Sequence, residues 1–273
     1  QGAPEPAVER VSTGRKGKKS VATEAPVDGL PAPTVPATDF VITDDVNLGE
    51  GGLITKFNDN LAAIRLLKKL ESEQRRATSA EQKVLARYVG WGGLKTAFKR
   101  PDGTYAKGWE TRAKDLESIL TPDELESANR SVLDAHYTSK DVVSAMWSAA
   151  KHLGFSGGVV LEPSVGIGNF LGLAPADLRE NARFLGVELD SLTGRMVKAL
   201  YPQAIIHAGI GFEDAPIGNG IAQLAIGNPP FGPQGLYFDK SSGKQHLNGQ
   251  SIHNQFFMGS CDALAPGGLQ IMV

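Results

Sequence analysis

From residue 136 to the end of the chain, short apolar segments alternate with segments of helical pattern. The apolar segments are predicted strands at 159–161, 184–188, 204–207, 224–226 and after Pro266-Gly267-Gly268. Helices are predicted between them, the clearest at about 191–200 and 252–264. Short apolar strands that alternate with helices are typical of a parallel sheet covered on both faces. This part of the chain therefore predicts an α/β fold.

The residues before this alternation lack a strand pattern. Residues 1–39 contain no aromatic residue and are rich in Pro, Ala, Thr and Val, so they cannot bury enough apolar surface to offset their ordering entropy. We therefore expect a disordered tail or linker over residues 1–44. Residues 45–135 are predicted to form a small helical region, to which the sequence assigns no chemistry.

Three helices are expected in this region. The first has an apolar stripe with three-residue steps, formed by Leu61, Ile64, Leu67 and Leu70. Ser79 with Gln82 predicts a capping box at the start of the second helix. The run Thr121-Pro122-Asp123-Glu124 predicts the start of the third, with an N-cap, a proline in the first turn and an acidic residue at the third position.

Composition excludes several classes of protein. The 273 residues carry a formal net charge of −2, so the composition does not indicate that the chain as a whole binds nucleic acid tightly. A single cysteine, Cys261, excludes a disulfide framework and a multi-cysteine zinc site, and the spacing of the five histidines predicts no metal site. The chain has neither an apolar run of 18 residues nor a secretion signal, and we expect a location in the bacterial cytosol. Because it begins with Gln1 and stops inside an apolar run, we expect it to be part of a longer polypeptide.

A glycine-rich turn follows the first predicted strand, in the run Glu162-Pro163-Ser164-Val165-Gly166-Ile167-Gly168-Asn169-Phe170. Two glycines two residues apart let the backbone turn sharply and approach a ligand closely. The dinucleotide fingerprint would place a third glycine where this chain has Leu171. The acidic Glu162 suits a ligand that bears an ammonium group better than it suits a pyrophosphate.

An acidic residue ends the second predicted strand. Glu188 comes about 20 residues after the glycine turn, the position from which an acid in this kind of fold accepts hydrogen bonds from ribose hydroxyls. A solvent-exposed acid that only stabilises the N-terminus of the next helix, through the helix dipole, would produce the same pattern.

The sharpest signal is Asn228-Pro229-Pro230-Phe231, directly after the fourth predicted strand. The prolines remove backbone donors and hold the chain extended, so the Asn228 side-chain oxygen and the Pro229 carbonyl can act as paired acceptors. Two acceptors that form hydrogen bonds with both hydrogens of an aromatic amino group can orient its lone pair toward an electrophile. Phe231 supplies a face on which a planar base can stack.

These pieces together resemble the adenine-N6 class of S-adenosylmethionine-dependent DNA methyltransferases. More closely, the chain is similar to large phage- and plasmid-encoded methylase–helicase proteins, some of which have antirestriction roles. The resemblance covers about residues 45–273. It rests on the glycine turn, Glu188, the Asn228–Phe231 tetrad and three further runs: His136-Tyr137-Thr138-Ser139, Tyr88-Val89-Gly90-Trp91-Gly92-Gly93-Leu94 and Ile252-His253-Asn254-Gln255-Phe256-Phe257.

The resemblance implies a Rossmann-like class I methyltransferase sheet, truncated after the fifth strand, over residues 136–273. It implies S-adenosylmethionine as cofactor, with its methionine end against Tyr137, Thr138, Glu162 and the backbone of Gly166 and Gly168, and its ribose on Glu188. The catalytic residues would be Asn228, Pro229, Pro230 and Phe231. The implied partners are DNA, held mainly by regions outside this chain, and a helicase region in the same polypeptide.

One departure from the family pattern concerns the third strand. The acid that commonly contacts the cofactor adenine there is replaced by Gly211, ahead of Phe212, and Glu213 or Asp214 can substitute for it. The resemblance thus implies Phe212 and Glu213 as further cofactor-binding residues. Three alternatives stay open on the sequence alone: methylation of RNA, methylation of a protein glutamine amide, and a noncatalytic antirestriction or structural module that retains the fold.

Overall fold

The computed structural model describes residues 38–46, 49–132, 138–232 and 235–273, which belong to one compact unit. Most of the predicted tail, the predicted boundary at residue 135 and Tyr137 lie outside the described residues. Among the described residues, no helix is both long enough and apolar enough to pass through a membrane.

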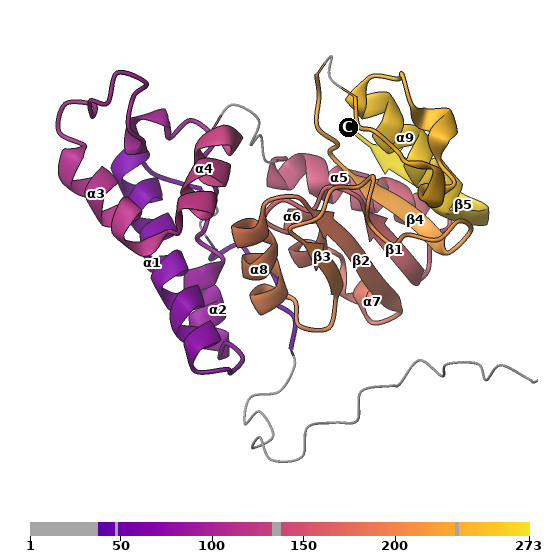
Figure 1. Cartoon of the computed structure of the whole chain (residues 1–273). Coiled ribbons are helices and arrows are strands. Elements are labelled where there is room, and N and C mark those ends of the chain that lie inside the picture. Colours follow the sequence, from indigo (N-terminus) through magenta and orange to yellow (C-terminus); the bar gives the residue numbers. More distant parts are fainter. Residues whose placement is uncertain (1–37, 47–48, 133–137, 233–234) are drawn as a thin grey trace, which may run out of the picture. The chain divides into compact units, whose positions relative to one another are not determined.

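The second half of the chain forms a five-stranded parallel sheet. Its strands are β1 (Gly158–Glu162), β2 (Ala182–Glu188), β3 (Ile205–Ala208), β4 (Ala222–Gly227) and β5 (Leu264–Met272). They lie in the order β3-β2-β1-β4-β5 (Figure 1), with every neighbouring pair parallel. This is the strand order of a doubly wound, Rossmann-like sheet, and it confirms the predicted fold class.

The order of the strands reverses between β1 and β4. Open α/β sheets bind their ligands at this switch point, outside the carboxyl ends of the strands. The glycine turn and the Asn228–Phe231 tetrad follow β1 and β4, so the fold brings the two sharpest sequence signals to this one place.

Helices cover both faces of the sheet, and side chains alternate between two apolar clusters. On one face, Val160, Phe184 and Leu224 belong to a cluster that includes the buried side of α5 (Lys140–His152) and of α8 (Ser191–Leu200). On the other face, Leu161 and Ala225 pack in a cluster with α9 (Ile252–Ala263). The short helices α6 (Asn169–Gly172) and α7 (Ala176–Arg179) connect β1 to β2.

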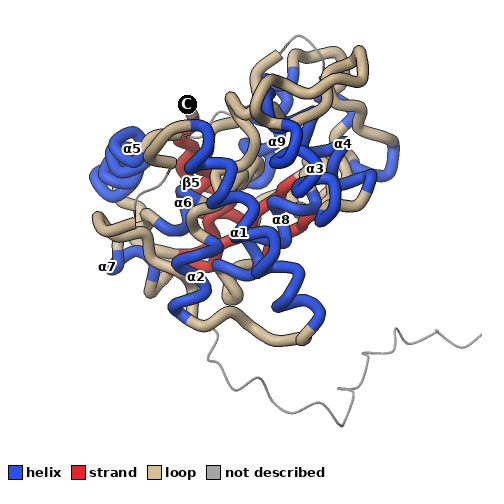
Figure 2. The backbone as a smooth tube through the Cα atoms, turned by 90° about the vertical axis from the view of Figure 1, so that its left-hand side faces the viewer, coloured by secondary structure: helices blue, strands red, loops and turns tan. Residues whose placement is uncertain are grey.

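The N-terminal helices contact this fold through α8. They are α1 (Leu53–Ser72), α2 (Ser79–Leu85), a 3-10 turn η1 (Lys95–Ala97), α3 (Glu110–Ile119) and α4 (Pro122–Ser131). Figure 2 shows α1 and α2 beside α8, and the buried residues of α1, α2 and α8 belong to the same apolar cluster as one face of the sheet. The helical region therefore shares a core with the sheet.

Three details differ from the sequence predictions. The capping box of α2 pairs Thr78 with Glu81, one residue earlier than predicted, because Gln82 is buried and donates to backbone carbonyls instead. Helix α3 was not predicted, since its short sequence shows a weak apolar pattern. Strand β5 begins at Leu264, ahead of the predicted glycine pair, because a shift in register lets Leu264 pair with Ala222.

The predicted tail is also too long at its C-terminal end. Phe40 and Ile42 are buried, with 7% and 8% of their surface exposed. Their backbone N–H groups donate to the carbonyls of Leu200 and Gly172, each at 2.9 Å. Residues 38–44 are therefore part of the folded unit, because Phe40 and Ile42 supply the apolar surface that residues 1–39 lack.

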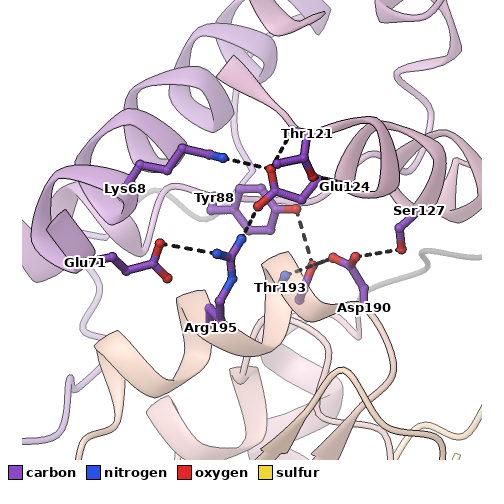
Figure 3. Close-up of polar contacts among 9 residues, drawn as sticks. All are labelled: Lys68, Glu71, Tyr88, Thr121, Glu124, Ser127, Asp190, Thr193 and Arg195. Atoms are coloured by element: carbon purple, nitrogen blue, oxygen red, sulfur yellow. Dashed lines mark hydrogen bonds and ion pairs between the residues drawn. The ribbon is translucent and has the colours of Figure 1, made fainter. Parts of the chain in front are cut away.

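Charged side chains join the helical region to α8. Glu124, in the first turn of α4, accepts a hydrogen bond from Lys68 of α1 at 2.8 Å and pairs with Arg195 of α8 (Figure 3). It also closes the capping box of α4, since its carboxylate accepts from the backbone N–H of Thr121 at 2.8 Å. One carboxylate, 11% exposed, thus ties three helices together.

A second set of contacts lies next to this one. The Tyr88 hydroxyl is 3.3 Å from the Thr193 hydroxyl, and Ser127 of α4 donates to Asp190 at 2.8 Å (Figure 3). Asp190 is the N-cap of α8, where its side chain accepts from the backbone N–H of Thr193. The helical region is therefore bonded to the residue that starts α8, two positions after Glu188.

Replacing Glu124 with alanine is expected to lower the free energy of unfolding by about 2 kcal/mol, because the change removes a cap and two charged contacts at once. Urea denaturation measures this difference. The matched control is Glu126→Ala on the same helix, where the side chain is 71% exposed and lies 3.9 Å from Arg130. We expect the control to change stability by less than about 0.5 kcal/mol. Equal losses in the two variants would contradict the role given to Glu124.

Candidate ligand site at the carboxyl edge of the sheet

Three polar side chains meet at the carboxyl edge of the adjacent strands β2, β1 and β4. Glu162 is the last residue of β1, Glu188 is the last residue of β2, and Asn228 directly follows β4. A Cβ atom placed on Gly227 would lie 3.5 Å from the Glu162 side chain, so Glu162 lies against the end of β4. The sequence predicted that these residues share an edge, and the strand order places them on three neighbouring strands.

The glycine turn adopts backbone angles that favour glycine. Gly166 has φ +55° and Gly168 has φ +81°, both in the left-handed region. A Cβ atom on Gly168 would also lie 2.5 Å from the ring of the buried Tyr201. Position 168 therefore accepts only glycine without a shift of the turn or of Tyr201.

Glu188 is held in place by backbone donors. One carboxylate oxygen accepts from the N–H of Gly166 at 2.8 Å, and the other accepts from the N–H of Asp190 at 2.9 Å. Burial raises the pKa of Glu188 to about 7, although these backbone hydrogen bonds act in the opposite direction. The residue predicted to hold a ribose thus links the glycine turn to the start of α8.

Glu162 is a buried acid with an oxygen that has no hydrogen-bond partner among the described residues. The side chain is 2% exposed, and its Oε2 atom makes no hydrogen bond to any described residue. Burial, with a smaller contribution from the nearby charge of Glu188, raises the pKa of Glu162 well above its usual range. A buried carboxyl group without a partner is costly, and such groups are concentrated at functional sites.

The tetrad after β4 has a buried end and an exposed end. Pro229 is buried, and the Oδ1 atom of Asn228 is buried with no hydrogen-bond partner among the described residues. Phe231, by contrast, is 64% exposed, and its ring lies 6.1 Å from the ring of His253 in the first turn of α9. An unused acceptor and an open aromatic face therefore occur three residues apart.

The segment after β3 contains Gly211 in place of the acid that commonly contacts the cofactor adenine. The sequence left open whether Glu213 or Asp214 takes over that contact. A Cβ atom on Gly211 would lie 2.4 Å from Oε2 of Glu213, so the Glu213 carboxylate fills the space next to this glycine. That oxygen is buried and has no hydrogen-bond partner among the described residues. Phe212, the other predicted cofactor residue of this segment, is only 2% exposed and stacks on Phe256 at 4.8 Å, so its ring is part of the core and does not offer an open face to a ligand.

Two of the predicted cofactor residues precede α5. Tyr137 lies outside the described residues. Thr138 is described, and its carbonyl accepts a hydrogen bond from the Asn169 side chain at 3.2 Å, so it lies beside the glycine turn.

Leu189 was not predicted as a site residue from the sequence. It follows Glu188 at the end of β2, and its side chain is 72% exposed. The available signal was an apolar residue between two acids, in Glu188-Leu189-Asp190, at the end of a strand. An exposed leucine beside the candidate ribose acid can cover one face of a planar ring.

Within the part of the chain that the structure describes, no three His, Cys, Asp or Glu side chains are grouped as metal ligands would be. The site is thus defined by two buried acids, an unused amide oxygen, a tight glycine turn and exposed apolar side chains. Such a set suits an organic ligand with cationic and hydroxyl groups.

Comparison with known proteins gives one curated relative. The chain is 26% identical over 140 residues to the "Defense against restriction protein B" of Escherichia phage P1, a match that covers 50% of this chain and 6% of the relative. The chain thus corresponds to a small part of that protein's length. No protein-family model matches the chain.

The solved structures to which the chain is similar include methyltransferases. One is the methyltransferase subunit of a type I restriction-modification system from Streptococcus thermophilus, at 13% identity and a TM-score of 0.41, covering 81% of this chain and 68% of that one. Another is the geranyl diphosphate C-methyltransferase of Streptomyces coelicolor, crystallised with S-adenosyl-L-homocysteine, at 17% identity and a TM-score of 0.33. That match covers 50% of this chain and 48% of the other.

Proposed function

We propose that this chain binds S-adenosylmethionine and transfers its methyl group to the exocyclic amino group of adenine in DNA. The observation that carries the proposal is that Asn228 Oδ1 and Glu162 Oε2, at the ends of adjacent strands at the switch point of the sheet, are buried and have no hydrogen-bond partner among the described residues. One is an acceptor for an amino group that is to be methylated, and the other is an acceptor for an ammonium group of the cofactor.

The residues at this edge fit the cofactor. Glu162 would accept the ammonium group, the backbone of Gly166 and Gly168 would let the amino-acid portion approach, and Glu188 would accept the ribose hydroxyls. Leu189 would cover one face of the adenine ring. Glu213 would take the role of the acid that the family pattern has at the position of Gly211. When bound, S-adenosylmethionine supplies a methyl group on a sulfonium, which is a good leaving group, so the protein needs no covalent intermediate.

The protein's own part in the reaction is to position the amino group of the base. The Asn228 side-chain oxygen and the Pro229 carbonyl would accept its two hydrogens and direct its lone pair toward the methyl carbon. As the nitrogen–carbon bond forms, the carbon–sulfur bond breaks, its electron pair stays on sulfur, and one amino proton is lost to solvent. Phe231, being exposed, would stack on a base swung out of the duplex.

The DNA substrate follows from the resemblance of the tetrad, and the match to an antirestriction protein supports the same choice. In this proposal, further regions of a longer polypeptide, a helicase region among them, hold the DNA. This assignment agrees with the chain's own net charge of −2, which provides little general attraction for a phosphate backbone.

A substrate panel tests the proposal. The full-length polypeptide that contains this chain is incubated with labelled S-adenosylmethionine and with duplex DNA, DNA in which N6-methyladenine replaces adenine, structured RNA, or a glutamine-containing protein. We expect label only in unmodified DNA, in the form of N6-methyladenine. Label in RNA or protein would overturn the DNA assignment, and cofactor binding without transfer to any substrate would favour a noncatalytic module.

A further inference from the structure

A cavity of about 350 Å³ lies beside the glycine turn, on the side of the helical region. Ile167 and Asn169 of the turn and Thr138 ahead of α5 form part of its wall. The rest of the wall includes Val89, Gly92 and Lys56, which come from the helical region. Residues more than 40 positions before the first strand therefore help to enclose the space next to the turn.

The run Tyr88–Leu94 is fixed in this position by a buried asparagine. Asn60, which is fully buried in α1, accepts from the N–H of Val89 at 2.8 Å and donates to the carbonyl of Gly90 at 2.5 Å. Trp91 and Leu94 are buried at 1% and 0% exposure. The turn is thus anchored on both sides, which leaves Val89 and Gly92 at the cavity wall.

The cavity is lined by positive charge. Lys56 and Lys140 both line it, and none of the described residues that line it is acidic. Lys140 is paired with Asp44, whereas Lys56 forms no ion pair with the residues that the structure describes. In addition, Ser139 is the N-cap of the 13-residue helix α5, and its side chain makes no capping hydrogen bond among the described residues, so the N-terminus of α5, with its partial positive charge, lies at the same place.

The two sides of the glycine turn therefore differ in charge. The edge of the sheet presents the acids Glu162 and Glu188, and the cavity presents Lys56 and the start of α5. An amino acid carries an ammonium and a carboxylate on one carbon atom, so it requires acceptors and donors at adjacent positions. The cofactor of the proposed function ends in such a group, and its carboxylate is its only anion.

We propose that Lys56, brought to the cavity by α1, pairs with the carboxylate of the cofactor's amino-acid end, and that the Tyr88–Leu94 run serves to close this cavity. The inference rests on the proposed function and extends it, because it gives the helical region a part in ligand binding. Lys56 is a binding residue in this scheme and takes no part in the transfer itself.

The test compares two ligands that differ only in the carboxylate. Isothermal titration calorimetry of the protein with S-adenosylmethionine and with decarboxylated S-adenosylmethionine gives the two affinities. In Lys56→Met we expect the affinity for S-adenosylmethionine to fall by about tenfold or more, the effect of losing a charge-assisted hydrogen bond. The affinity for the decarboxylated ligand should change by less than about twofold, since its binding does not use this pair.

Two further variants serve as controls. Lys69→Met removes a lysine from the same helix at a position where the side chain is 60% exposed and 3.9 Å from Glu73, and it should leave both affinities unchanged. Lys56→Arg keeps the positive charge and should restore much of the discrimination between the two ligands. Thermal melts of all variants confirm that they are folded.

Three other outcomes would contradict either the role given to Lys56 or the proposed function. Equal losses for both ligands in Lys56→Met would show a structural role and overturn the inference. Unchanged affinities together with a raised KM for DNA would assign Lys56 to a DNA phosphate and would also overturn it. Failure of the unaltered protein to bind either ligand would overturn the proposed function itself.

Discussion

Replacement of Asn228 with alanine is expected to lower the turnover of methyl transfer by about 10²–10³-fold while leaving cofactor affinity nearly unchanged. The reason is that its side-chain oxygen, which has no partner among the described residues, is the acceptor that positions the amino group. Loss of one preorganised polar contact at a reacting centre has this size of effect. Single-turnover rates with saturating cofactor measure the chemical step, and calorimetry measures the affinity.

Two variants complete this experiment. Asn228→Asp keeps an oxygen acceptor at the same position, so it should retain more activity than the alanine variant. Asn129→Ala, at an exposed position on α4, should be as active as the unaltered protein. Turnover that is unchanged in Asn228→Ala would remove the central support for amino-group methylation.

The second large effect is expected at Glu162. Its carboxylate is the proposed acceptor of the cofactor ammonium, so Glu162→Gln should weaken cofactor binding by about 10²-fold, through loss of a charge-assisted contact in a buried place. In the unaltered protein the affinity should also rise with pH, because the raised pKa leaves part of the Glu162 population protonated and unable to pair. Titrations over a pH series measure both effects, and the variant should lack this pH dependence of binding.

The stability of the protein without cofactor should respond in the opposite direction. Because burial raises the pKa of Glu162 in the folded state, the native protein holds this proton at pH values where the unfolded chain has released it. Stability therefore falls as the pH rises from the unfolded pKa, near 4.5, through the raised native pKa. Glu162→Gln removes this loss, so the variant should gain stability relative to the unaltered protein as the pH increases.

Thermal melts from pH 5 to pH 9 measure this difference. Glu180→Gln, at an exposed position, is the control and should follow the unaltered protein at every pH. A Glu162→Gln variant that is less stable than the unaltered protein at high pH would show that the carboxylate has a stabilising partner, and would contradict its role as an acceptor kept free for a ligand.

Much of the fold could be predicted because its signals are local. Each of the five strands is a short apolar run, and the starts of α4 and α8 are marked by Thr121 and Asp190, whose side chains cap the backbone within three residues. The edge residues could also be predicted, since Glu162, Glu188 and Asn228 each lie at the end of a strand or directly after one, and parallel strands all end at the same edge.

The parts that could not be predicted depend on contacts between distant residues. The hydrogen bonds of Asn60 with Val89 and Gly90 join positions about 30 apart in the sequence. Nothing in the local sequence of α1 indicates that this asparagine is buried. Likewise, nothing in the local sequence distinguishes Lys56 from the many solvent-exposed lysines. Only the fold shows that it lines the cavity. The capping box of α2 was misplaced by one residue because Ser79 and Gln82 match the same local pattern as Thr78 and Glu81.

The shared core of α1, α2 and α8 bears on how such a protein can be divided or inherited. Leu192, Met196 and Val197 of α8 are at most 1% exposed, and they belong to the cluster that also contains the buried side of α1. A polypeptide that started at the sheet would lack the part of this core that α1 and α2 supply, and it would expose the surface of α8 that contacts them. We therefore expect the sheet and the N-terminal helices to be retained together as one folding unit, and the sheet alone to self-associate.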